Sequence, residues 1–171
     1  MGPFPRDDEE NRFLFVIVDS CSRFCILGKA KTINAQEVAK FLLKEVFCMF
    51  GLPQEIHSDR GPEFNNDVLK KLFELLAIEQ SFSVPHHHQS NGMVERKNRD
   101  VLSLLRKLLL TYQSYNSWSS LVPLIQVILN SSVNSITGCT PSSLLFGSDI
   151  LEALSQIDKV LAITYDYCDV V

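Results

Sequence analysis

The sequence lacks several features that mark particular protein classes. Its five cysteines are odd in number and include no Cys-x-x-Cys pair, which argues against a disulfide framework or a zinc site and favours reduced thiols inside a cell. No apolar run is long enough to span a membrane, and the first residues are acidic, unlike those of a signal peptide. No internal repeat or low-complexity tract is present. We therefore expect an intracellular globular protein with no membrane partner.

An excess of positive charge is missing as well. The net charge is −4 at pH 7, which argues mildly against a free-standing DNA-binding protein. The distribution of charge along the chain weakens this argument. One predicted helix carries Arg96, Lys97, Arg99, Arg106 and Lys107, whereas residues 148–171 hold five acids and one lysine. A local basic strip can bind phosphates on an acidic domain, although such a strip is more often only a solvated face.

The pattern that is present is that of an α/β protein. Hydrophobic residues make up 46% of the chain, so we expect one domain with a real core over residues 1–147, followed by an acidic tail over 148–171. Apolar runs predict strands at 12–19, 24–30, 55–58 and 78–84, and the first of these suits a strand buried on both faces. Cap and turn residues predict helices beginning at Asn34, Asn66, Gly92, Ser117 and Thr140. This order predicts a mixed β-sheet with helices on both faces.

Two carboxylates stand at positions where a metal ion can be held. Asp59 follows a short strand and precedes a Gly-Pro turn, and Glu95 falls in the predicted first turn of the long helix. Each alone is more often a turn residue or a complement to the helix dipole. Together they can share a divalent cation such as Mg²⁺, which keeps several waters and binds substrate phosphates.

Two motifs raise the case for a functional site. The first is Ser58-Asp59-Arg60-Gly61-Pro62-Glu63-Phe64, and the second is Gln89-Ser90-Asn91-Gly92-Met93-Val94-Glu95-Arg96, with thirty-five residues between Asp59 and Glu95. With these motifs the chain closely resembles the integrase catalytic core of retroviruses and LTR retrotransposons, and the Ty3/gypsy type is nearest. The resemblance extends from Gly2 to about Gly147 and is highly specific.

The resemblance implies a ribonuclease H-like fold and DNA integration, in which metal-dependent strand transfer uses two Mg²⁺ or Mn²⁺ ions held by two Asp and one Glu. It makes Asp59 and Glu95 the catalytic and metal-binding carboxylates of this chain. It also implies a homo-oligomer that acts in the nucleus. Its expected partner is DNA, contacted by Gln89, Asn91, Arg96, Lys97 and Arg99.

The first catalytic Asp of the family has no match in this sequence. Gly2-Pro3-Phe4-Pro5 matches the segment that follows the strand carrying that Asp, so the resemblance places it before Met1 and implies that the first strand is truncated. Asp7 and Asp8 lie in a hairpin loop and are not expected to replace it. Spacing alone nominates Asp19 as the third metal ligand, although it matches a different family position. We therefore predict that the chain is inactive as it stands.

Three functions remain open. The first is a DNA integrase core, and the second is a domesticated, catalytically silent module of the same origin that binds DNA or protein. The acidic surface favours the second, as does the lack of the zinc-binding module and the small basic domain that the resemblance leads us to expect before and after the core. A ribonuclease H-type nuclease of the same fold has no support from the Gln-Ser-Asn-Gly-x-Val-Glu-Arg motif.

Overall fold

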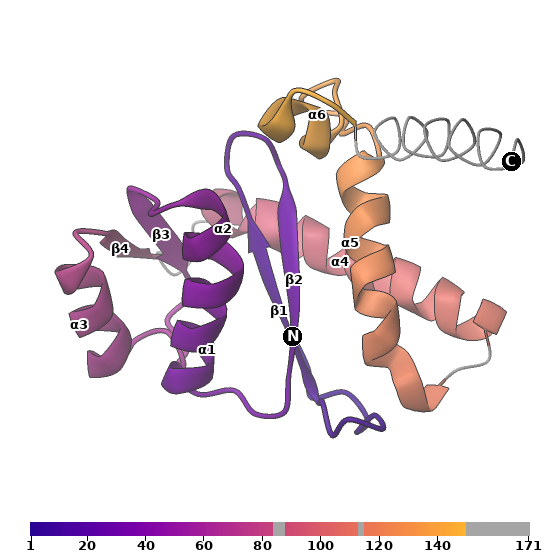
Figure 1. Cartoon of the computed structure of the whole chain (residues 1–171), viewed down its shortest axis with the longest axis horizontal. Helices are drawn as coiled ribbons and strands as arrows, with labels where there is room; N and C mark the ends of the chain where they lie inside the picture. Colours follow the sequence, from indigo (N-terminus) through magenta and orange to yellow (C-terminus); the bar gives the residue numbers. More distant parts are fainter. Residues whose placement is uncertain (84–87, 113–114, 150–171) are drawn as a thin grey trace, which may run out of the picture.

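The computed structural model describes residues 1–83, 88–112 and 115–149 (Figure 1). Its strands are β1 (Phe13–Val18), β2 (Cys25–Ala30), β3 (Glu55–Ser58) and β4 (Glu79–Phe82). Its helical segments are α1 (Ala35–Phe41), η1 (Leu42–Phe47), α2 (Cys48–Phe50), α3 (Asp67–Leu75), α4 (His88–Tyr112), η2 (Tyr115–Leu121), α5 (Val122–Ser131) and α6 (Pro141–Phe146). No helix in these three ranges is long and apolar enough to cross a membrane.

The strands form two pairs. β1 and β2 are antiparallel, with Phe13 opposite Ala30, and β3 and β4 are parallel, with Glu55 opposite Glu79. The strand set is mixed, as predicted. The described residues form two two-stranded sheets, however, and not one continuous sheet.

The outer edge of β1 is only partly paired. Met1 and Leu14 exchange two main-chain hydrogen bonds, at 2.7 and 2.9 Å. Val16 and Val18 direct their main-chain groups to the same edge, because alternate residues of an antiparallel strand bond to opposite neighbours. Within the ranges that the structure describes, no strand pairs with these two residues. The resemblance predicts the first strand of the family at this edge, and that remains a prediction.

Helices cover both faces of the strands, as predicted (Figure 1). On the side of α1 and α3 the buried cluster consists of Phe15, Ala30, Val38, Leu42, Phe47, Leu69, Phe73 and Ile78. On the side of α4 and α5 it consists of Leu14, Cys25, Leu27, Val101, Leu105, Trp118, Val122, Ile125 and Leu129. Successive residues of β1 thus enter different cores, which confirms that this strand is buried on both faces.

A glycine allows α1 to lie close to the hairpin. A Cβ atom on Gly28 would overlap the ring of Phe41. That ring also lies against Phe15 of β1, with 5.1 Å between the ring centroids. The close approach of α1 to β2 therefore depends on the missing side chain at Gly28.

Most predicted helix starts are confirmed, and one is wrong. Asn34, Asn66 and Thr140 each accept a hydrogen bond from the main-chain N–H three residues later, at 2.9 to 3.2 Å. Ser117 lies at a kink inside η2, with φ −121° and ψ 35°, and its predicted role as a cap remains a prediction. α5 itself begins after Leu121 without a side-chain cap. The long helix α4 begins at His88 and not at Gly92.

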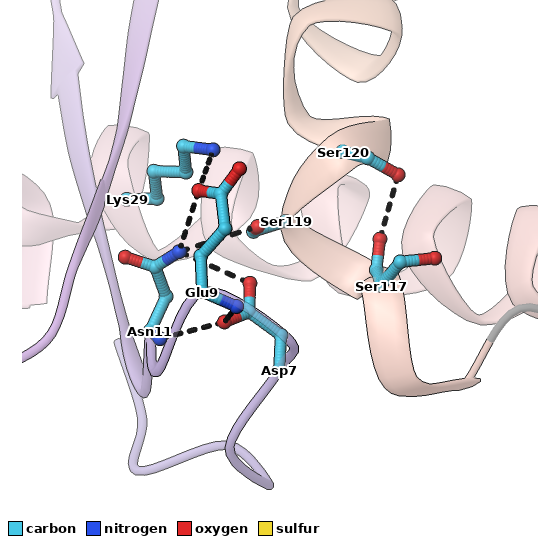
Figure 2. A network of polar contacts seen from close by, with 7 residues as sticks. All are labelled: Asp7, Glu9, Asn11, Lys29, Ser117, Ser119 and Ser120. Carbon is cyan, nitrogen blue, oxygen red and sulfur yellow. Dashed lines mark hydrogen bonds and ion pairs between the residues drawn. The ribbon is translucent and has the colours of Figure 1, made fainter.

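The N-terminal loop is fastened to η2 by buried polar groups (Figure 2). The Asp7 carboxylate accepts hydrogen bonds from the Asn11 N–H at 2.6 Å and from the Asn11 side-chain amide at 3.0 Å. The same amide donates to Ser119 Oγ at 3.3 Å, and Trp118 Nε1 donates to the Pro5 carbonyl at 3.0 Å. Asp7 therefore holds the loop in place.

Candidate metal and nucleic-acid site

Asp59 lies directly after β3 in an exposed turn, as predicted. One carboxylate oxygen accepts a hydrogen bond from the Gly61 N–H at 3.0 Å, and Ser58 Oγ donates to the Asp59 carbonyl at 3.0 Å. These bonds hold the side chain at the carboxyl end of the strand. None of the ion pairs formed among the described residues involves Asp59, so its carboxylate is open to a cation from solution.

A further carboxylate, Glu63, lies against the same turn. A Cβ on Gly61 would stand 2.7 Å from Glu63 Oε2, which shows how closely the Glu63 carboxylate approaches the main chain of this turn. Burial lowers the pKa of the Met1 ammonium, and the carboxylates of Glu63 and Asp59 act in the opposite direction. Glu63 is not among the predicted site residues, although its position four residues after Asp59 is a signal for it.

Glu95 lies on the exposed side of α4. Because α4 begins at His88, Glu95 falls in its second turn and not in its first, which corrects the predicted position. It forms none of the ion pairs of the described residues, and Arg99 follows one helical turn later. Its carboxylate is thus free to bind a cation, as that of Asp59 is.

The described ranges contain no group of three or more His, Cys, Asp or Glu side chains that could hold a metal ion. A three-carboxylate centre is therefore not assembled from these residues. The predicted approach of Asp59 and Glu95 to each other remains a prediction.

Asp19 has a different surrounding. Its carboxylate accepts hydrogen bonds from both the N–H and the hydroxyl of Ser22, each at 2.7 Å. Although desolvation raises the pKa of Asp19, these bonds and the charge of Arg23 bring it below its ordinary value. Asp19 closes the turn between β1 and β2, and this local role accounts for its position.

The predicted basic strip of α4 divides into two faces. Arg96 and Arg99 are exposed, but Lys97 is only 8% exposed. Burial raises the pKa of the Cys25 thiol to about 11, and the charge of Lys97 acts against that rise, which places the ammonium close to β2. Lys97 therefore lies on the inner face, and we leave it out of the surface that faces DNA.

Gln89 and Asn91 belong to the first turn of α4 and not to a loop. The helix therefore begins four residues before its predicted start at Gly92. Residues 85–87 and the side chains of Gln89 and Asn91 lie outside what the structure describes.

Comparison with known proteins decides the family. The family model described as "Integrase core domain" matches residues 3–88, which is just over half of the chain. The chain belongs to the integrase core domain family. Asp59 lies inside the matched segment and Glu95 beyond it.

Retroviral polyproteins are among the relatives of this integrase core. The Pro-Pol polyprotein of simian foamy virus type 1 is 35% identical over 149 residues, which cover 87% of this chain and 12% of the polyprotein. The Gag-Pol polyprotein of feline leukemia virus is 35% identical over 137 residues, 80% of this chain and 8% of the relative. The chain thus spans about an eighth or less of the length of these relatives.

Solved structures support the same fold. The catalytic core domain of BIV integrase is 26% identical, with a TM-score of 0.63 over 82% of this chain and 89% of that one. The dimeric form of the HTLV-2 integrase catalytic core domain in complex with magnesium is 25% identical, with a TM-score of 0.61 over 75% of this chain and 80% of that one. The predicted ribonuclease H-like fold and the integrase resemblance are confirmed.

Proposed function

We propose that this integrase core acts on DNA and holds Mg²⁺ or Mn²⁺ between Asp59 and Glu95. The observation that carries the proposal is the Asp59 carboxylate, held at the carboxyl end of β3 and free of any ion pair among the described residues. A hard cation that keeps its own waters needs only a few such oxygens. The donor type fits, and the dimeric HTLV-2 relative was solved with magnesium.

In this proposal each residue has a defined task. A bound metal ion supplies activation of water or of a 3′-hydroxyl for attack on a DNA phosphodiester. Asp59 and Glu95 hold the ion, while Arg96 and Arg99 bind phosphates beside it, with Gln89 and Asn91 as hydrogen-bonding partners for DNA. We place the action of the protein in the nucleus, where chromosomal DNA is the target.

A binding module without catalysis is the second candidate. Two observations favour it. Asp59 and Glu95 are open carboxylates, but the described residues contain no group of three side chains that could hold a metal ion. We propose that this chain alone binds one ion weakly and does not assemble the paired-ion centre. Strand transfer then requires a further carboxylate, and a strand at the open edge of β1 is the place for it.

We also propose that the protein forms a homo-oligomer. The Phe50 and Phe146 rings are 42% and 55% exposed and lie 6.2 Å apart, with Phe24 packed beside both. Exposed aromatic clusters of this kind favour association. The HTLV-2 integrase catalytic core domain, which was solved in a dimeric form, supports a second copy as the partner.

The metal site is tested by titrating Mn²⁺ into the protein labelled with ¹⁵N. We expect selective broadening of the amide signals of Gly61 and Arg96, because each is close in sequence to one proposed ligand. Asp59→Asn should remove the effect at both positions, whereas Asp67→Asn, an exposed acid on α3, should leave it unchanged. Broadening at Gly61 alone would show that Asp59 and Glu95 do not share an ion.

A further inference from the structure

The second half of α4 carries a shallow groove that the integrase reaction does not explain. It has a volume of about 440 Å³ and is lined by Arg99, Leu102, Ser103, Arg106, Lys107 and Leu110. All six residues come from one helix, at the spacing that places them on one face. Arg106 and Lys107 lie two turns beyond Arg99 and are not among the predicted DNA contacts.

The cations of this groove have no counter-charge of their own. None of the ion pairs among residues 1–83, 88–112 and 115–149 involves Arg99, Arg106 or Lys107. The lining residues include no acid, so three positive charges face solvent together. Such a surface attracts a segment of negative charge.

The groove is also apolar, which narrows the chemistry of its partner. Leu102 and Leu110 lie among the three cations, and Leu110 is 67% exposed. A DNA backbone presents phosphates and sugars but no aliphatic side chains to cover a leucine. A peptide with acids and aliphatic residues satisfies both parts of the surface.

We propose that residues 150–171 of this chain occupy the groove. This segment contains four acids (Glu152, Asp158, Asp166 and Asp169) and one base (Lys159), a net charge of 1 − 4 = −3 against the three cations of the groove. Its aliphatic residues include Leu151, Leu154, Ile157 and Leu161. The sequence therefore supplies both of the properties that the groove selects.

The length of the segment allows this contact. Asp149 is the last residue before it, and 22 residues can span up to about 70 Å when extended. Because the segment is tethered, its effective concentration at the groove is high, and modest affinity is sufficient. Docking covers Arg99 and so competes with DNA for that side chain. The contact itself does not depend on the proposed function.

Cysteine cross-linking tests the contact in the full chain. Cys168 provides the reactive thiol within the segment, and Cys21, Cys48 and Cys139 are replaced by serine to remove the other exposed thiols. Ser103→Cys then places a partner thiol in the groove. Gln36→Cys is the matched control, because it is exposed on α1, on the opposite face of the strands. A short bismaleimide joins thiols that come close together.

We expect intramolecular cross-linking of Ser103→Cys to be about tenfold faster than that of Gln36→Cys at about 0.1 M salt, and this advantage to disappear at about 1 M salt. Arg106→Glu with Lys107→Glu should remove it, and adding Asp158→Lys with Asp166→Lys should restore it. Equal rates at the two positions, or a rate unaffected by the charge reversals, would overturn the proposal. Cross-links between two molecules only would also overturn it, in favour of a second copy.

Discussion

Asn130 of α5 pairs with Cys25 of β2 as a neighbouring strand would. Asn130 Oδ1 accepts a hydrogen bond from the Cys25 N–H and its Nδ2 donates to the Cys25 carbonyl, both at 2.8 Å. Gln126, one helical turn earlier, accepts from the Leu27 N–H at 2.7 Å. Two side-chain amides of α5 thus cover the outer edge of β2, which protects it from pairing with other chains.

Replacing Asn130 by alanine should therefore be strongly destabilising. Asn130 is 1% exposed, so the change leaves both main-chain groups of Cys25 buried without partners. We expect a loss of roughly 2–4 kcal/mol in the free energy of unfolding, measured by urea denaturation. Gln36→Ala, at an exposed position of α1, is the control and should change stability by less than about 0.5 kcal/mol. If Asn130→Ala lowers the free energy of unfolding by as little as the control does, water molecules replace the hydrogen bonds of Asn130 to Cys25.

Acid stability should depend on Asp7. Although desolvation by burial raises the pKa of Asp7, hydrogen bonds from Ser119, Asn11 and Glu9 bring it below its ordinary value of 3.8. A carboxyl group with a lowered pKa stabilises the fold above pH 3.8, and this contribution is lost as the pH falls through the folded-state value.

The test compares Asp7→Asn with the wild type by thermal unfolding at several pH values. We expect the variant to be less stable by about 1–3 kcal/mol near neutral pH, and the difference to shrink below pH 3.8. Asp8→Asn, in the exposed part of the same loop, should follow the wild type. A difference that does not change with pH would mean that the charge of Asp7 is not what holds the loop.

The Cys25 thiol should be protected from alkylation. Burial raises its pKa to about 11, whereas Cys21, Cys48 and Cys139 are exposed. At pH 8, iodoacetamide should modify the three exposed thiols and spare Cys25 until the protein unfolds, because the thiolate is the reactive form. Peptide mapping by mass spectrometry measures this. Modification of Cys25 at the rate of Cys139 in the folded protein would contradict the packing of β2 against α5.

The parts of the fold that the sequence predicts are those set by local contacts. Asn34, Asn66 and Thr140 cap their helices through bonds to residues three positions away, so a short window contains both partners. The apolar run of β1 likewise indicates burial on both faces without knowledge of its neighbours. Features that depend only on neighbouring residues, such as these caps and this strand, can therefore be predicted from the sequence alone.

The parts of the structure that the sequence does not predict depend on contacts between residues far apart in the chain. The position of η2 is one of these parts, because Trp118 and Ser119 are bound to Pro5 and Asn11, more than a hundred residues earlier in the sequence. Lys97 reads as part of a basic strip, yet it stands four residues before the buried Val101 and so falls on the inner face. This spacing is a signal that could have excluded it. The identity of the third metal ligand depends on which carboxylate the tertiary structure brings close to Asp59 and Glu95, and sequence spacing alone does not determine this.

DNA binding should respond to the two faces of α4 differently. Arg96→Gln and Arg99→Gln should each weaken binding to any sequence and reduce the log–log salt slope by about one unit, because each removes a phosphate contact. Lys97→Gln should leave the slope unchanged and alter stability instead, since Lys97 is buried. Fluorescence anisotropy over a salt series measures both. An equal effect of all three substitutions on the slope would place Lys97 at the DNA surface.

The final prediction concerns catalysis. With Asp59 and Glu95 alone, we expect no metal-dependent DNA joining by this chain, because a paired-ion centre needs a further carboxylate. Loss of one preorganised electrostatic group already costs on the order of 10² to 10³ in rate, and loss of a metal site should cost more. A chain extended upstream by a strand that ends in Asp and pairs with the open edge of β1 should recover activity, and Asp59→Asn should abolish it again.

The assay is strand transfer between labelled DNA duplexes in Mg²⁺ and in Mn²⁺, with Asp67→Asn as the control for a general effect of lost charge. Asp19→Asn in the unextended chain separates the two candidates for the third ligand. Asp19 already accepts two hydrogen bonds from Ser22, so its substitution should loosen the turn between β1 and β2 without affecting metal binding. If the unextended chain joins DNA, and both Asp59→Asn and Asp19→Asn abolish joining, then Asp19 is the third ligand and the first carboxylate lies within this chain.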